Sequence, residues 1–176
     1  MIFDRLFRPR PAQAAGRALY ANAVDQARRP SLYAQLQAPD TPEGRFEVYT
    51  LHVVILLDRL RGHGVQASET SQVLFDTYVQ SLDDALREMG VGDLSVGKKM
   101  RKLGEAFYGR AKSYEAAFKA LPDVQPLTAL LERTVYAGVD SPPAPDLADY
   151  VLTQRATLAE QPLERLLEGE AAWSAA

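Results

Sequence analysis

The sequence contains no cysteine and only two histidines, His52 and His63, among its 176 residues. The lack of cysteine excludes disulfide bonds, iron–sulfur clusters, cysteine-ligated zinc and thiol catalysis. If the two histidines lie on one helix, a rise of about 1.5 Å per residue places them about 16 Å apart, which is too far for one small metal ion. We therefore expect no metal site and no cofactor.

Long apolar runs are also missing. The longest extends from Val53 to Leu57, which is five residues, whereas a transmembrane helix needs about 20. The first residues, MIFDRLFRPRP, lack the apolar core of a signal peptide. We expect a cytoplasmic protein with no transmembrane segment.

Motifs of catalysis and nucleotide binding are incomplete. The spacing from Gly92 to Lys98 matches part of a phosphate-binding loop, but Lys99 stands where that motif has serine or threonine. Asp83 belongs to an acidic cluster next to Arg87 that could serve acid–base chemistry. The spacing of four residues between Asp83 and Arg87 favours a surface ion pair instead. We predict no catalytic residues and a protein that is not an enzyme.

The charge is unevenly distributed around a net value of −3. Residues 98–119 contain seven basic and two acidic residues, whereas residues 120–176 contain three basic and nine acidic ones. Basic residues interleaved with Phe107 and Tyr108 are typical of surfaces that bind RNA or acidic proteins. The alternative interpretation is a solvated helix face with Phe107 in the core.

The spacing of apolar residues predicts an all-α fold, a single-domain antiparallel bundle of six or seven helices. The segment 46–61 is apolar on nearly every side, so we expect a central, buried helix. His52, inside it, is interpreted as a buried, hydrogen-bonded histidine, with a haem or metal ligand as the alternative. The predicted helices cover 12–28, 46–61, 68 to about 89, 96–120, 126–137, 146–160 and a short segment from Pro162, with Ser68, Ser95 and Asp146 as capping residues.

Proline and glycine suggest the divisions of the chain. We predict a flexible basic N-terminus at 1–11, a helical domain at 12–140, a proline-rich linker at 141–145 and a C-terminal helical extension at 146–176 that frays from Gly169. The segment 39–44 is predicted as a turn. Gly104 and Gly109 are expected to admit the close approach of another backbone.

Four segments of the chain form an ordered set of motifs. They are Asp40-Thr41-x-x-Gly44-Arg45-Phe46-Glu47 with Leu51-His52, then Leu74-Phe75-Asp76, then LREMGVGDLSVGKKM from Leu86 to Met100, and finally Glu105 to Arg110. The third segment is long and specific, and the four keep their order along about residues 17–140. Together they resemble the ubiquinol–cytochrome c chaperone family.

The resemblance implies a non-enzymatic chaperone of respiratory complex III assembly. Mitochondrial members bind newly made cytochrome b, associate with the ribosome near its tunnel exit and act with a small partner protein. We expect this chain to lack the mitochondrial presequence and the anchor, since it is similar to short bacterial members. We expect a client such as cytochrome b or another nascent membrane protein, with the ribosome as a further partner, no DNA, and peripheral contact at the inner face of the cytoplasmic membrane.

We expect the client to bind at the corner formed by residues 83–110 and at the turn of residues 40–49. Two alternatives are a ribosome-associated adaptor that uses residues 98–112 and a haem carrier that uses His52. The expected client-binding residues are Arg45, Asp83, Arg87, Asp93, Lys98, Lys99, Lys102, Tyr108 and Arg110, and Gly90, Gly92 and Gly97 are expected to shape the corner.

Overall fold

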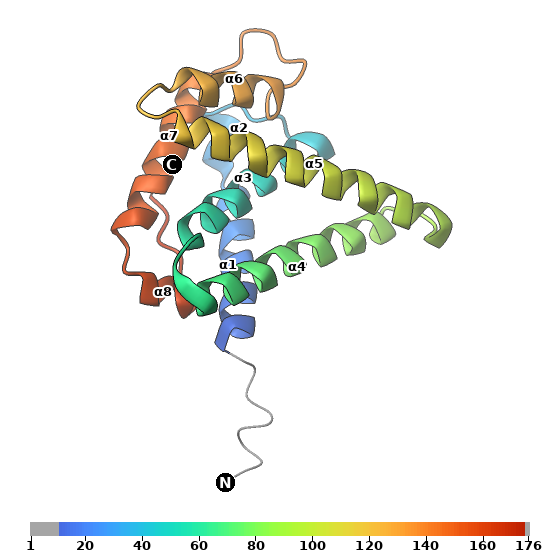
Figure 1. The fold of residues 1–176 in the computed structure, drawn as a ribbon. Helices are drawn as coiled ribbons and strands as arrows, with labels where there is room; N and C mark the ends of the chain where they lie inside the picture. The colour runs from blue at the N-terminus through green and yellow to red at the C-terminus, as the bar shows by residue number, and fades with distance from the viewer. Residues whose placement is uncertain (1–10, 175–176) are drawn as a thin grey trace, which may run out of the picture.

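The computed structural model describes residues 11–174, apart from the side chains of residues 93 and 94, and over that range its regular secondary structure is helical, without strands. The predicted all-α class is confirmed, and the short α2 brings the number of helices in the described range to eight (Figure 1). The helices are α1 (Pro11–Ala27), α2 (Pro30–Ala34), α3 (Pro42–Leu60), α4 (Gly64–Glu88), α5 (Asp93–Lys119), α6 (Gln125–Arg133), α7 (Ala144–Glu160) and α8 (Leu163–Leu167).

Helix α3 lies at the centre of the core. Its residues from Thr50 to Leu56 are all buried, because apolar side chains occupy its whole circumference and every side needs a cover. Helices α1, α4, α5 and α7 all pack against it. The expected position of this helix is thus confirmed.

The start of α3 corrects the predicted turn. The Thr41 hydroxyl accepts a hydrogen bond from the backbone N–H of Gly44 at 3.1 Å, and Pro42 occupies the first turn. An N-terminal cap followed by proline is a favourable helix start. The helix therefore begins at Pro42, four residues before the predicted start.

Other predicted boundaries are also wrong by a few residues. Helix α4 begins at Gly64 rather than Ser68, since Ala67 in its first turn is already buried in the core. Neither Ser95 nor Asp146 caps a helix, because α5 and α7 begin before them, after Gly92 and Pro143. The predicted helix 126–137 already ends at Arg133 (α6), and turns follow. Tertiary burial, rather than local capping, decided these ends.

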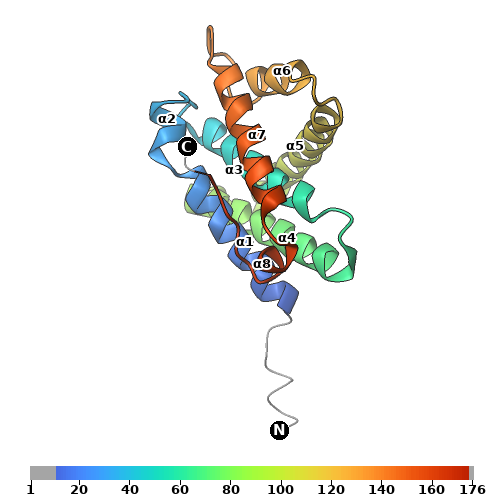
Figure 2. The same ribbon diagram turned by 90° about the vertical axis from the view of Figure 1, so that its left-hand side faces the viewer.

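The C-terminal segment is packed, which corrects the predicted fraying from Gly169. The N–H of Ala172 donates to Gln161 Oε1 and the N–H of Ser174 donates to Gln154 Oε1, both at 2.8 Å. Figure 2 shows this segment returning from α8 beside α1 and α7. The boundary at 141–145 stays a prediction, and the structure adds that buried residues of α7 and α8 share one core with α3.

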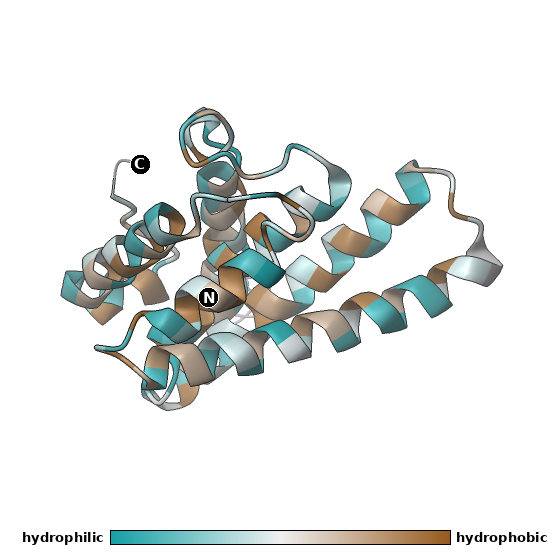
Figure 3. Ribbon diagram, turned by 90° about the horizontal axis from the view of Figure 1, so that it is seen from above, coloured by the Kyte–Doolittle hydropathy of each residue, from teal (hydrophilic) through white to brown (hydrophobic). Residues whose placement is uncertain are grey.

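Helices α4 and α5 form a hairpin that extends beyond the other helices (Figures 1 and 3). We call residues 79–106 the arm. Three rings join the helices at its base: the centroid of Phe107 lies 5.0 Å from that of Phe75 and 5.2 Å from that of Tyr78. Aromatic pairs at this separation stabilise a contact beyond their buried area. The cluster therefore holds the base while the rest of the arm projects.

Glycine permits a close approach at Gly16 and not at the two positions expected. A Cβ on Gly16 would lie 2.6 Å from Val73 Cβ and 2.9 Å from the backbone nitrogen of Leu74, so α1 and α4 touch there. A Cβ on Gly104 or Gly109 would have no atom of another segment within 4 Å. The expected backbone contact at those two residues is wrong.

Alanine substitutions at two helical glycines should therefore have opposite effects. We expect Gly16→Ala to lower the free energy of unfolding by about 1–3 kcal/mol through overpacking. Gly104→Ala should raise it by about 0.5–1 kcal/mol, because alanine loses less backbone entropy in a helix. Urea denaturation followed by circular dichroism measures both. A stable Gly16→Ala protein would contradict the tight contact between α1 and α4.

Candidate functional site

An apolar groove lies where the arm meets the start of α3. Its volume is about 650 Å³. Phe46 contributes from α3, Leu82 and Leu86 from α4, Met89 from the C-cap that follows α4, and Leu103 from α5. Met89 is 62 % exposed, although it is a large apolar residue. A concave apolar surface of this size is typical of a binding site.

Charged groups surround the groove at the start of α3. Asp40, Glu43 and Arg45 lie at this end, and Arg45 Nε is 2.5 Å from Asp40 Oδ1. The guanidinium lowers the pKa of the Asp40 carboxyl through this hydrogen bond. Both side chains are more than half exposed, so water screens the pair and its contribution to stability is small. The charges therefore remain accessible to a ligand.

One ion pair holds α5 against α3 beside the groove, just below the base of the arm. Arg110 donates to both carboxylate oxygens of Glu47, at distances of 2.8 to 3.1 Å. Glu47 is only 8 % exposed. A bidentate ion pair of this kind fixes the relative orientation of the two side chains as well as their distance. The carboxylate raises the pKa of Arg110. Arg110 is thus occupied inside the protein.

Two further cavities have more polar linings. One of about 670 Å³ shares Asp40, Arg45 and Tyr49 with the groove, and Arg28 Nε donates to Tyr49 Oη there at 2.9 Å. The other, of about 360 Å³, lies between α3 and α7. Its charges are already paired, with Arg155 2.8 Å from Asp58. The first cavity extends the groove, whereas the second holds the helices together.

The structure brings part of the predicted binding set together. Arg45 borders the groove, and Asp83 and Arg87 form the predicted ion pair on α4 at 2.6 Å. Lys98, Lys99 and Lys102 are exposed on α5, Tyr108 is 64 % exposed at its base, and Arg110 is paired with Glu47, whereas the side chain of Asp93 lies outside the described residues.

The three glycines expected at the corner have different settings. Gly90 has a φ of +80° directly after α4, a conformation that favours glycine. Gly92 is the residue before the first turn of α5, and Gly97 lies inside that helix with open space around it. The turn itself thus requires glycine only at Gly90.

Sequence reasoning missed the apolar lining of the groove. It selected charged residues and Tyr108, whereas Phe46, Leu82, Leu86, Met89 and Leu103 resemble ordinary core positions in the sequence. Met89 next to Gly90, at a helix end, was the available signal. Only the packing shows that its side chain stays uncovered.

His52 is a core residue, which confirms the first interpretation of it. Its Nδ1–H donates to the carbonyl of Val48 at 2.7 Å, and its Nε2 accepts from the Tyr150 hydroxyl at 2.8 Å. Gln26 in turn donates to that hydroxyl at 2.8 Å. Because this chain of bonds occupies both ring nitrogens, His52 has no free lone pair for a haem iron or metal.

The described residues offer neither a metal site nor a membrane span. Within residues 11–174, no group of three or more histidine, aspartate or glutamate side chains could hold a metal ion. Over the same described range, none of the helices combines the length and hydropathy of a membrane span.

Comparisons with known proteins give the class. Residues 34–173 match the family model described as ubiquinol-cytochrome C chaperone. A crystal structure of the Cbp3 homolog from Brucella abortus is 37 % identical, with a TM-score of 0.87 over 99 % of this chain and 97 % of that one. No curated protein matches. This chain belongs to the ubiquinol–cytochrome c chaperone family, whose role is complex III assembly.

The burial of His52 predicts a pH dependence of stability. Burial lowers its pKa from 6.5 to about 4. Between these values the unfolded chain binds a proton that the folded chain does not, so stability falls as the pH decreases. We expect His52 to contribute a loss of at most about 1.4 kcal/mol per pH unit, about 3 kcal/mol in all.

Urea denaturation at pH values from 7 to 4 measures this contribution. His52→Gln should be less stable at neutral pH and should lose stability less steeply on acidification. The exposed His63 offers a matched control, and His63→Gln should keep the slope of the natural chain. Equal slopes for all three proteins would show that His52 does not titrate as its burial requires.

Proposed function

We propose that this chaperone binds newly made cytochrome b, or a similar nascent membrane protein, during assembly of the cytochrome bc1 complex, without catalysis. The groove at the base of the arm carries the proposal. Its lining is apolar, it lies between three helices and it is open to solvent at Met89. A helix-in-groove contact uses this kind of surface to bury the apolar face of a partner helix.

The size of the groove fits a segment of helix. At about 650 Å³, it accommodates several large side chains from successive turns, at positions i, i+3, i+4 and i+7. Burying one large apolar side chain contributes about 1.5–3 kcal/mol. Several such side chains suffice for a transient complex that later releases its client.

The charges beside the groove favour a client with a basic flank. Glu43 lies at this end of the groove in the first turn of α3, and among the described residues it has no ion-pair partner, whereas Asp40 is paired with Arg45 and Glu47 with Arg110. Transmembrane segments carry extra lysine and arginine on their cytoplasmic side. The Glu43 carboxylate therefore suits the flank of a membrane segment that is held before or during insertion.

The predicted binding residues take different parts in this proposal. Arg45 lines the groove, whereas Asp83 and Arg87 on α4 and the three lysines and Tyr108 on α5 lie on the helices beside it, from which we expect them to contact or orient the client. Asp93 stays a predicted member of this set. Arg110 acts indirectly, because its pair with Glu47 positions the arm. The apolar anchors are Phe46, Leu82, Leu86, Met89 and Leu103.

A ribosome-associated role is a second candidate, favoured by the exposed lysines of α5. The ribosome and a small partner protein would then act beside the client. Either role places the protein in the cytoplasm, at the inner face of the membrane.

A charge placed in the groove should block client binding. We expect Met89→Asp to weaken binding of an apolar helical peptide from cytochrome b by about tenfold or more, because it removes apolar contact and adds a charge that must be desolvated. Fluorescence anisotropy of the labelled peptide measures the affinity.

Val65 provides the matched control for this variant. It is also a large exposed apolar residue on α4, 77 % exposed, but at the opposite end of the helix from the groove. Val65→Asp should leave the affinity unchanged, and both variants should unfold within about 0.5 kcal/mol of the natural chain. Equal affinities for the two variants would rule out the groove as the binding site.

Photo-crosslinking in native cells identifies the client. A photoreactive residue replaces Arg45, Arg87, Lys99 or Tyr108, with Val65 as the control position. We expect cytochrome b to be captured from several of the four and not from the control. Capture of ribosomal proteins alone would favour the adaptor role, and capture of a second copy alone would identify a dimer interface.

A further inference from the structure

The outer face of α5 carries a cluster of unpaired basic residues. Because about 3.6 residues make one turn, positions 98, 101, 102, 105, 108 and 112 fall on one side of the helix, with position 99 at its edge. All seven residues are exposed. Glu105 is the one acidic residue among them. We call the five cations the α5 basic face: Lys98, Lys99, Arg101, Lys102 and Lys112.

The α5 basic face differs from the basic residues elsewhere in the protein. In the described part of the chain, none of its five side chains has a hydrogen bond or ion pair. Most other cations do, as Arg61 and Lys119 show by sharing Glu115. The unpaired Arg17, Arg29 and Arg133 are scattered over α1, the residue before α2, and α6.

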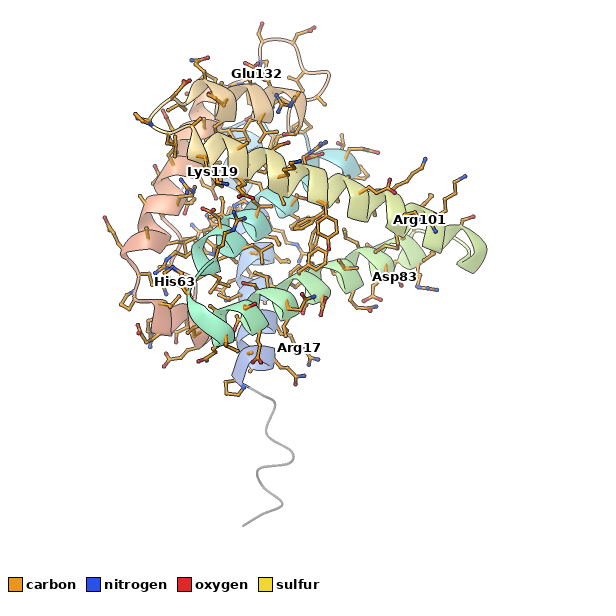
Figure 4. The ribbon with its side chains drawn as sticks, in the orientation of Figure 1. Arg17, His63, Asp83, Arg101, Lys119 and Glu132 are labelled. Carbon is orange, nitrogen blue, oxygen red and sulfur yellow. The ribbon has the colours of Figure 1, made fainter. Side chains whose placement is uncertain are left out.

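We propose that the α5 basic face docks on the surface of a bilayer that contains anionic phospholipids. The arm projects from the body of the molecule, and Figure 4 shows Arg101 on its outer part. From Lys98 to Lys112 the face extends about 21 Å along the helix at 1.5 Å per residue. Four of the five cations lie within residues 98–102 near the end of the arm, where they can meet a flat membrane surface without any change in the fold.

Tyr108 supports a bilayer over a nucleic acid. Its ring packs at 5.6 Å from Phe75 and 6.0 Å from Phe107, and the residue still remains 64 % exposed. A tyrosine whose ring lies on an apolar surface and whose hydroxyl group stays in water is typical of membrane interfaces. Binding of single-stranded RNA uses a basic groove with several stacking rings, whereas this face is a convex helix with one ring.

The docking would explain why groove and basic face share the arm, and this point rests on the proposed function. Client helices emerge at the membrane surface. A chaperone held there by α5 keeps the neighbouring groove within reach of the segment that it receives.

Flotation of the full-length protein with lipid vesicles tests the proposal. We expect binding to vesicles of phosphatidylglycerol mixed with phosphatidylcholine and none to pure phosphatidylcholine. Each basic residue near an anionic surface changes partitioning about fivefold. The variant Lys98→Glu/Arg101→Glu/Lys102→Glu should therefore lower the partition coefficient about 100-fold or more. About 0.5 M salt should release the natural chain, because it shortens the screening length.

Arg17→Glu/Arg29→Glu/Arg133→Glu is the matched control. It changes the net charge by the same amount at three exposed, unpaired cations outside α5, and Figure 4 shows Arg17 on α1, far from the end of the arm. This variant should retain most vesicle binding. If both triple variants lose binding equally, net charge rather than this face is responsible and the proposal is overturned. No flotation of the natural chain overturns it too, as does binding to transfer RNA without binding to vesicles.

The groove variant separates this proposal from the proposed function. Met89→Asp should lose the client peptide in solution and still float with anionic vesicles. The α5 triple variant should lose the vesicles. If the natural chain floats with anionic vesicles but does not bind the client peptide, the client groove is contradicted and the membrane contact is not.

Discussion

The burial of α3 is the constraint on which the rest of the structure depends. A helix that is apolar on every side cannot lie on a surface, so other helices must enclose it completely. Helices α1, α4, α5 and α7 do so. The short α2 and α8 and the C-terminal segment close the remaining gaps, and Trp173 packs edge-on against His52 at 5.4 Å. The fold is therefore an arrangement around one helix rather than a row of equal helices.

The arm follows from the same constraint. Helices α4 and α5 have 25 and 27 residues, whereas α3 has 19. Only part of their length is needed to cover α3, so their joined ends extend past the core. The ring cluster of Phe75, Tyr78 and Phe107 and the pair of Glu47 with Arg110 fix the angle at which they leave it. Apolar residues near the base of the arm then line an open groove.

A second internal network ties the C-terminal half to the same centre. The bonds from Gln26 to Tyr150 and from Tyr150 to His52 join α1, α7 and α3. Leaving a buried polar group unpaired costs its hydration without compensation, and here Gln26 Nε2, the Tyr150 hydroxyl and both nitrogens of His52 are paired, whereas Gln26 Oε1 is not. This requirement selects one arrangement of the three helices, and it uses the one buried histidine for structure rather than for chemistry.

The sequence by itself determined the helical class, the central position of α3, the core role of His52, the ion pair of Asp83 with Arg87 and, through its motifs, the family. Each depends on local spacing or on side-chain chemistry that neighbours along the chain reveal. The tertiary structure decided the helix ends at Gly64 and Arg133, the packing of residues 169–174 and the partner of Arg110. It also decided that Leu82, Leu86 and Met89 line a groove. These features depend on contacts between residues far apart in the chain. Whether an apolar side chain is exposed depends on whether such distant residues pack over it.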